Sequence, residues 1–179
     1  MLDLEKALIP KPQRLVRGKE TVKIAKFYAP ACKIEAACED VRIAEGAALV
    51  RARIHELALC EGEHEDFTVR IFVDATHESF RGIDKNEAYF IKVDAEGATL
   101  CGKDAAGAFY AAVTFSQMLY MAGDELCVEC AEVLDWPDFA RRGHFIESRY
   151  GTEFLTRENW FDFIDYVAKM KINTLTVGV

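Results

Sequence analysis

Hydrophobic residues along the chain follow two spacings, and each spacing predicts one kind of element. Apolar residues alternate with other side chains over 67–73, as in a strand with one buried face. Strands of similar content are expected at 21–28, 67–73, 89–94, 98–102 and 126–133. Apolar residues recur near helical spacing in two longer stretches, each preceded by an aspartate that can cap a helix. Helices are therefore expected at 40–59 and 105–121.

The order of these elements predicts an α+β domain over residues 1–135. The strands at 89–94 and 98–102 are separated by a tight turn, Ala95-Glu96-Gly97, and should form an antiparallel hairpin. Helices rich in alanine, with Gly107 in the second, can lie close to a sheet. We expect helices on one face of a mostly antiparallel sheet.

The pattern changes after Asp135, and residues 136–179 are expected to form a second unit. A short apolar strand at 143–146 precedes a helix at 157–170, and a second apolar strand follows at 172–179. Thr156 can cap this helix. Its expected apolar stripe is Trp160, Phe161, Ile164, Val167 and Ala168. Two parallel strands joined by a helix form a right-handed β-α-β unit, and we interpret this one as the first part of a truncated (β/α)8 barrel.

The composition of the chain disfavours several classes of binding partner. The chain is 51% hydrophobic and carries a net charge of −8, which disfavours nucleic acid and anionic membrane surfaces as partners. No apolar run approaches the roughly 18 residues of a membrane span, and the acidic N-terminus does not resemble a signal peptide. The six cysteines show no disulfide-like spacing. We expect reduced thiols in a cytoplasmic protein, with no metal and no cofactor.

Candidate substrate-binding residues lie at the end of the first expected barrel strand. Glu147, Ser148, Arg149 and Tyr150 follow the apolar run 143–146, at the end where barrel strands deliver polar groups to a ligand. The alternative is a structural ion pair, because Glu147 and Arg149 are two residues apart on one strand face. His144, within the strand, is expected to be a packed core residue rather than a catalytic base.

Three motifs stand out in the second half of the sequence. The hairpin and helix at 89–119 contain Gly102, Asp104, Gly107, Tyr110, Thr114 and Gln117, the passage into the second unit contains Asp135, Pro137, Phe139, Arg142 and Gly143, and the entry to the last strand contains Lys171 and Asn173. At these positions the chain resembles the β-N-acetylhexosaminidases of glycoside hydrolase family 20. The first motif resembles the end of that family's N-terminal domain, and the other two resemble the entry into its barrel and its second barrel strand.

The sequence departs from family 20 at the first barrel strand. That family usually has Asp-x-Ser-Arg after Arg-Gly, whereas here Glu147 replaces the aspartate and Ser148-Arg149 comes one residue early. The run Glu147-Ser-Arg-Tyr-Gly151 also resembles the Glu-Gly-Phe-Tyr-Gly of family 84, a second group of β-N-acetylglucosaminidases. Both resemblances imply N-acetylated amino-sugar glycans as substrates.

The resemblance implies substrate-assisted, retaining hydrolysis, in which the sugar's 2-acetamido oxygen attacks the anomeric carbon. In both families the catalytic acid pair lies beyond the fourth barrel strand, and a barrel typically needs about 250 residues. We therefore predict an N-terminal fragment of a glycoside hydrolase that is inactive by itself and holds no catalytic residue. It would supply one wall of the sugar site, where Arg149 donates to hydroxyls, Glu147 accepts from them and Tyr150 packs on a ring.

Two alternatives remain open at this point. The chain could instead be a stand-alone carbohydrate- or protein-binding α/β module without catalysis. The barrel fragment would expose apolar side chains and strand edges, so it should either pack against the first domain or self-associate between chains.

Overall fold

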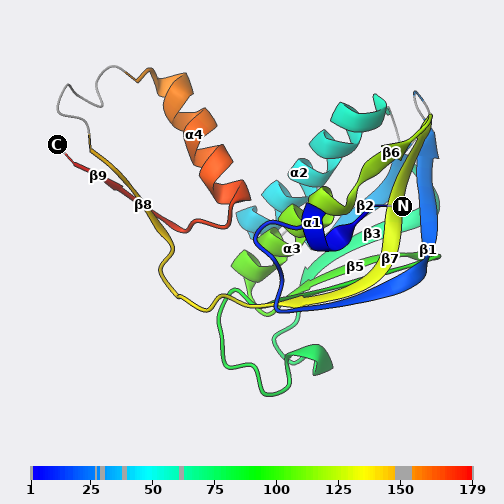
Figure 1. Cartoon of the computed structure of the whole chain (residues 1–179), viewed down its shortest axis with the longest axis horizontal. Coiled ribbons are helices and arrows are strands. Elements are labelled where there is room, and N and C mark those ends of the chain that lie inside the picture. The colour runs from blue at the N-terminus through cyan, green and yellow to red at the C-terminus, as the bar shows by residue number, and fades with distance from the viewer. Residues whose placement is uncertain are drawn as a thin grey trace. The chain divides into compact units, whose positions relative to one another are not determined.

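The structure is a computed structural model that describes residues 2–26, 28, 31–37, 40–60, 63–147 and 155–178. The chain divides into two compact units, Met1–Pro137 and Asp138–Val179. In the part of the chain that the structure describes, the first unit contains a large sheet with its covering helices, and the second contains a strand pair and a helix (Figure 1).

The first unit is a seven-stranded sheet of order β1-β7-β4-β5-β3-β2, with β6 paired to β7. The pairs β2–β3 and β3–β5 are parallel, and the other pairs are antiparallel. Its strands are β1 (Arg14–Lys26), β2 (Ala31–Ala36), β3 (Glu63–Val73), β4 (Tyr89–Asp94), β5 (Gly97–Gly102), β6 (Tyr120–Ala122) and β7 (Glu125–Asp135). Its helices are α1 (Leu4–Ala7), α2 (Val41–Ala58), the 3-10 turn η1 (Glu78–Phe80) and α3 (Ala105–Met118).

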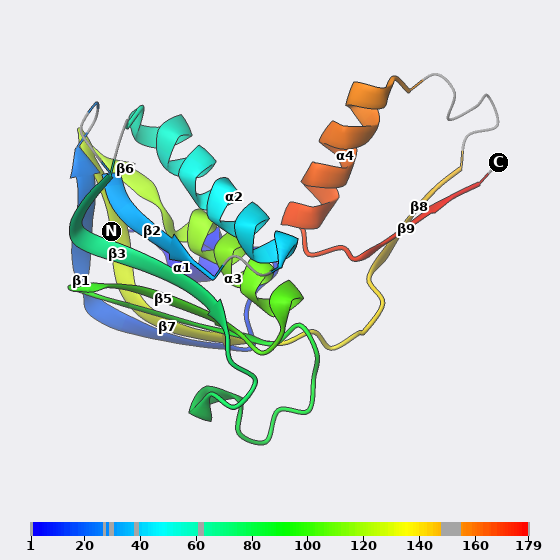
Figure 2. The same ribbon diagram turned by 180° about the vertical axis from the view of Figure 1, so that it is seen from behind.

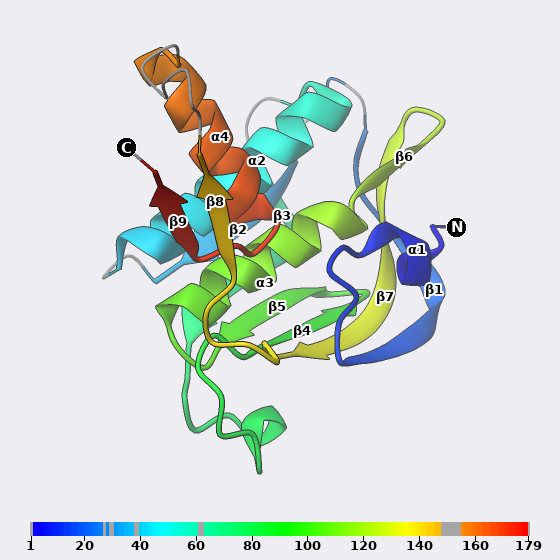
Figure 3. The same ribbon diagram turned by 60° about the vertical axis from the view of Figure 1, so that its left-hand side comes forward.

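Helices α2 and α3 lie side by side on one face of this sheet, as Figures 2 and 3 show from two directions. Asp104 caps α3 by accepting a hydrogen bond from the backbone N–H of Gly107 at 2.8 Å. A core of aliphatic and aromatic side chains fills the space between helices and sheet, with Phe115 and Ile91 fully buried. The expected α+β class, with helices on one face of a mostly antiparallel sheet, is confirmed.

Several elements extend beyond their sequence patterns. Strand β1 begins at Arg14 rather than 21, and Gly18 lies inside it. A Cβ at Gly18 would come 2.7 Å from the Cβ of Cys130, so glycine allows β1 to approach β7 closely. Strand β3 begins at Glu63 because its polar start pairs with β2, which the sequence pattern did not predict.

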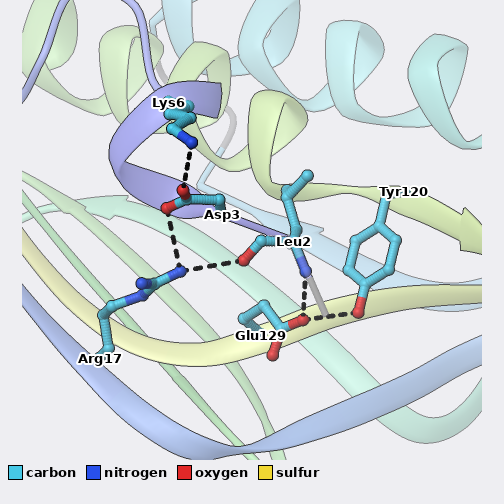
Figure 4. Close-up of polar contacts among 6 residues, drawn as sticks. All are labelled: Leu2, Asp3, Lys6, Arg17, Tyr120 and Glu129. Atoms are coloured by element: carbon cyan, nitrogen blue, oxygen red, sulfur yellow. Dashed lines mark hydrogen bonds and ion pairs between the residues drawn. The ribbon is translucent and has the colours of Figure 1, made fainter.

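The N-terminal segment is fastened to the sheet by a buried carboxylate (Figure 4). Glu129 on β7 is 5% exposed and accepts hydrogen bonds from the backbone N–H of Leu2 at 2.8 Å, Thr21 Oγ1 at 2.9 Å and Tyr120 Oη at 2.6 Å. Arg17 donates to the Leu2 carbonyl and pairs with Asp3. Helix α1 can then place Leu4 in the core.

The second unit is a β-α-β unit. Strands β8 (Gly143–Ile146) and β9 (Thr174–Val177) are parallel, and α4 (Arg157–Lys169) connects them (Figure 1). Thr156 and Asn159 form a reciprocal capping box at the start of α4. No helix in the described ranges is both long and apolar enough to cross a membrane.

The apolar stripe predicted for α4 is partly wrong. Val167 is buried, but Phe161 and Ile164 are 52% and 44% exposed. Phe163, which the stripe omitted, instead forms edge contacts with the rings of His144 and Trp160. The face toward the strands is therefore Trp160, Phe163 and Val167, at positions i, i+3 and i+7.

Candidate functional site

Glu147 lies just beyond β8, on the face of the strand pair opposite α4. The ring of His144 meets Phe163 of α4 with centroids 5.4 Å apart, so His144 points toward the helix. Side chains alternate along a strand, so Phe145 and Glu147 point to the other face. Both are exposed in this unit. The expected core position of His144 is wrong, because the residue is exposed, although its ring packs against Phe163.

The neighbouring strand presents the same face beside them. Phe145 pairs with Thr176, and Ile146 pairs with Val177. Gly178 directly follows β9, and its N–H donates to the Ile146 carbonyl at 2.9 Å, so Gly178 lies beside Glu147. This is the carboxyl end of both strands, the end that binds ligands in (β/α)8 barrels. Sequence reasoning missed Gly178, although placing the two strands in parallel register would have brought it next to Glu147.

The opposite end of the strand pair is held together by two residues from the family 20 motifs. Arg142 donates from Nε to the Lys171 carbonyl at 2.7 Å and from Nη1 to the Phe139 carbonyl at 2.9 Å. Asn173 accepts from the Arg142 N–H at 2.9 Å and donates to the Ala140 carbonyl at 2.8 Å. These bonds fix the amino ends of β8 and β9, so Arg142 and Asn173 act in stability.

Of the three predicted substrate-binding residues, the structure places Glu147 only. Arg149 and Tyr150 lie outside the described residues, as does Ser148. The shared sugar-binding role of Glu147, Arg149 and Tyr150 therefore stays a prediction, and so does the alternative ion pair between Glu147 and Arg149.

The motif residues of α3 also have structural roles. Thr114 Oγ1 lies 2.7 Å from the hydroxyl of Tyr89, which donates to Asp135 at 2.8 Å. Burial of the Tyr89 ring, together with the Asp135 carboxylate, raises the pKa of its hydroxyl well above the ordinary value. Gln117 donates to the carbonyl of Ile9 and accepts from its N–H. These contacts connect α3 to the sheet and to the N-terminal segment.

Residues near the joint between the two units pack within the first one. The Arg14 guanidinium lies 5.5 Å from the centroid of the Trp136 ring. Gln13 donates to the Trp136 carbonyl from Nε2 and to Asp135 from its backbone N–H. Trp136 is thus held by the start of β1.

Among the cysteines that the structure describes, Cys130 is half-buried and the other four are buried: Cys32, Cys60, Cys101 and Cys127. Burial raises the pKa of Cys101 to about 11 and also raises the pKa of Cys127 and Cys130. Cys127 and Cys130 are three apart on β7, so they point to opposite faces. Within the ranges that the structure describes, no three His, Cys, Asp or Glu side chains gather closely enough to hold a metal ion.

Comparison with known families decides which resemblance holds. The sequence profile described as "Glycosyl hydrolase family 20, domain 2" matches residues 5–136. The chain belongs to glycosyl hydrolase family 20. The profile match supports family 20 over family 84, which the run Glu147-Ser-Arg-Tyr-Gly151 also resembles.

Two relatives of this family 20 chain are named beta-hexosaminidase. The β subunit of beta-hexosaminidase from Sus scrofa is 31% identical over 108 residues, which cover 60% of this chain and 20% of that protein. A beta-hexosaminidase from Porphyromonas gingivalis is 32% identical over 96 residues, covering 50% of this chain and 12% of that protein. The chain thus spans a fifth or less of these relatives.

Solved structures extend the likeness to the second unit. The N-acetyl-β-hexosaminidase of Streptomyces plicatus has a TM-score of 0.72 and 20% identity, covering 98% of this family 20 chain and 34% of that protein. At this identity the match shows a shared fold.

Proposed function

We propose that this family 20 chain is the N-terminal part of a glycoside hydrolase that acts on glycans containing N-acetylhexosamine. The observation that carries the proposal is the position of Glu147, at the carboxyl end of a β-α-β unit that follows a family 20 domain. The relatives named beta-hexosaminidase support the substrate class.

The proposed reaction is substrate-assisted and retaining. The 2-acetamido oxygen of the sugar attacks the anomeric carbon while an acidic side chain protonates the departing glycosidic oxygen, and water later opens the cyclic intermediate. This route needs a carboxylate that orients the acetamide and a neighbouring acid. By the family resemblance, both belong to later barrel strands. We therefore propose that residues 1–179 alone do not hydrolyse the substrate.

The proposed contribution of this chain is one wall of the sugar site. The Glu147 carboxylate would accept hydrogen bonds from sugar hydroxyls, Arg149 would donate to them, and Tyr150 would pack against the ring. The exposure of Glu147 and its place on the face opposite α4 support its part in this wall.

Two further proposals concern the isolated chain. We propose that it self-associates through the second unit, because Phe161 and Ile164 expose apolar area on α4 and the described strand pair has two open edges. A second copy offers the same edges and apolar side chains. The cytoplasmic location expected from the sequence stays a prediction.

Hydrolysis of a chromogenic N-acetyl-β-glucosaminide tests the main proposal. The full-length protein that contains this chain should release the chromophore, and should do so far more slowly from the matching β-glucoside, which lacks the acetamide. The isolated 179-residue chain should release none. If the full-length protein binds N-acetylated glycans but cleaves none of them, the binding-module alternative holds and the proposed function is wrong.

A further inference from the structure

Gly178 occupies a position where any larger side chain would meet Glu147. A Cβ placed on Gly178 would lie 3.4 Å from Glu147 Cγ, 3.6 Å from Glu147 Cβ and 3.4 Å from Phe145 Cζ. These are ordinary contact distances for a single methyl group. The next atom of a longer or branched side chain would have to share space with the Glu147 side chain or the Phe145 ring. The Glu147 side chain therefore lies across the end of β9, above a residue that has no side chain.

A glycine here is not explained by its own backbone. Gly82 and Gly123 have positive φ angles, at 79° and 67°, and glycine is favoured there for that reason. Gly178 has no such angle, and it continues the parallel pairing by donating to Ile146. Glycine weakens a strand, so its presence in extended backbone commonly marks close approach by another group. Here the approaching groups are Phe145 and Glu147.

We propose that Gly178 is a positioning residue that determines where the Glu147 carboxylate stands, an inference that rests on the sugar-cleaving function proposed above. With Gly178 in place, Glu147 lies over the end of β9 on the face opposite α4. A bulky side chain at 178 would turn Glu147 away from that place. The carboxylate would then lose the sugar hydroxyl from which it accepts, although Glu147 itself remained.

The test compares Gly178→Ala and Gly178→Val in the full-length protein, alone and combined with Glu147→Gln. The valine variant should lower kcat/KM for a chromogenic N-acetyl-β-glucosaminide about tenfold, the loss expected for one hydrogen bond to a charged group, and the alanine variant should lose less. Gly178→Val should add nothing in the Glu147→Gln background, because both changes remove the same interaction.

Gly143→Val is the matched control, since Gly143 lies on the same face at the other end of β8. A Cβ there would lie 3.6 Å from the Thr174 carbonyl oxygen and meets no part of Glu147. It should keep kcat/KM within about twofold of wild type. Circular dichroism of each variant checks folding.

The outcomes separate the two proposals. A wild-type protein without activity overturns the proposed function, and the role of Gly178 falls with it. If the wild type is active and the Gly178→Val variant has the same kcat/KM, only the role of Gly178 is overturned. The same follows if the loss of kcat/KM caused by Gly178→Val multiplies with the loss caused by Glu147→Gln.

Discussion

Single polar residues hold the first unit at points where separate segments meet. Glu129 joins the N-terminal segment, β1 and β6 through one buried carboxylate. Figure 4 shows its hydrogen bonds with Leu2 and Tyr120. Burial by itself would raise the pKa of Glu129, but hydrogen bonds from Tyr120, Leu2 and Thr21 outweigh it and hold the pKa below its ordinary value of 4.5. The ionised form of Glu129 therefore stabilises the fold.

The pH dependence of unfolding follows from this shift. Because the folded pKa is depressed, the contribution of Glu129 is fully present above pH 4.5 and is lost as the pH falls through the lower, folded value. Glu129→Gln should reduce the free energy of unfolding in urea at pH 7 by about 1.5–3 kcal/mol. It should also flatten the loss of stability between about pH 5 and 3.

Glu132→Gln is the control for this measurement, because Glu132 lies exposed on the same strand. It should change the free energy of unfolding in urea at pH 7 by less than about 0.5 kcal/mol. Equal effects of the two substitutions would contradict the role given to Glu129.

At the scale of elements, sequence patterns predicted those whose signals are local. The hairpin at 89–102 and the start of α3 were predicted within a residue, because a tight turn and the Asp104 cap mark them. Strand β2 was missed because long-range pairing with β3 creates it. Strand β6 forms a local hairpin with β7 and was missed because the helix expected at 105–121 covered most of it. The position of Glu147 could be predicted because it directly follows β8 in the sequence. The effect of Gly178 on Glu147 could not, because it depends on the register in which β8 pairs with β9.

Close packing of α3 also depends on a glycine. A Cβ at Gly107 would lie 2.2 Å from the carbonyl oxygen of Ala88, a backbone atom that cannot move aside easily. Gly107→Ala should therefore destabilise the protein by up to about 2 kcal/mol, because overpacking costs about 1–3 kcal/mol and helix propensity returns about 1 kcal/mol.

Gly46→Ala in α2 is the matched comparison for thermal and urea unfolding. A Cβ there would lie 3.1 Å from the Cβ of Ala112, a tight contact with a side chain rather than an overlap with backbone. Its effect should stay within about 1 kcal/mol, since propensity and crowding oppose each other. Equal destabilisation by both substitutions would show that the Ala88 contact is not decisive.

At the scale of the whole molecule, the two units differ in how much apolar surface they cover. The first unit buries a continuous core between helices and sheet, whereas the second leaves Phe145, Phe161, Ile164 and Tyr166 exposed. A β-α-β unit of a barrel normally buries such residues against neighbouring strands and helices. This contrast is the physical basis for the proposed self-association of the isolated chain.

Light scattering after size-exclusion chromatography tests that association. The isolated chain should elute with a mass above the 20.2 kDa of one copy, rising with concentration. Replacing Phe161 and Ile164 together by serine should shift it toward the monomer. Val41→Ser, at a residue 70% exposed on α2, should not. A concentration-independent monomer would contradict the proposal.

The place of the sugar at the end of β8 is tested most directly by the kcat/KM of the full-length Glu147→Gln variant on a chromogenic N-acetyl-β-glucosaminide. The substitution keeps the size of the side chain and removes its charge. If Glu147 forms part of the sugar-binding wall, kcat/KM should fall about tenfold or more while the protein stays folded. An unchanged kcat/KM in a folded, active protein would contradict the placement of the substrate at this end of β8.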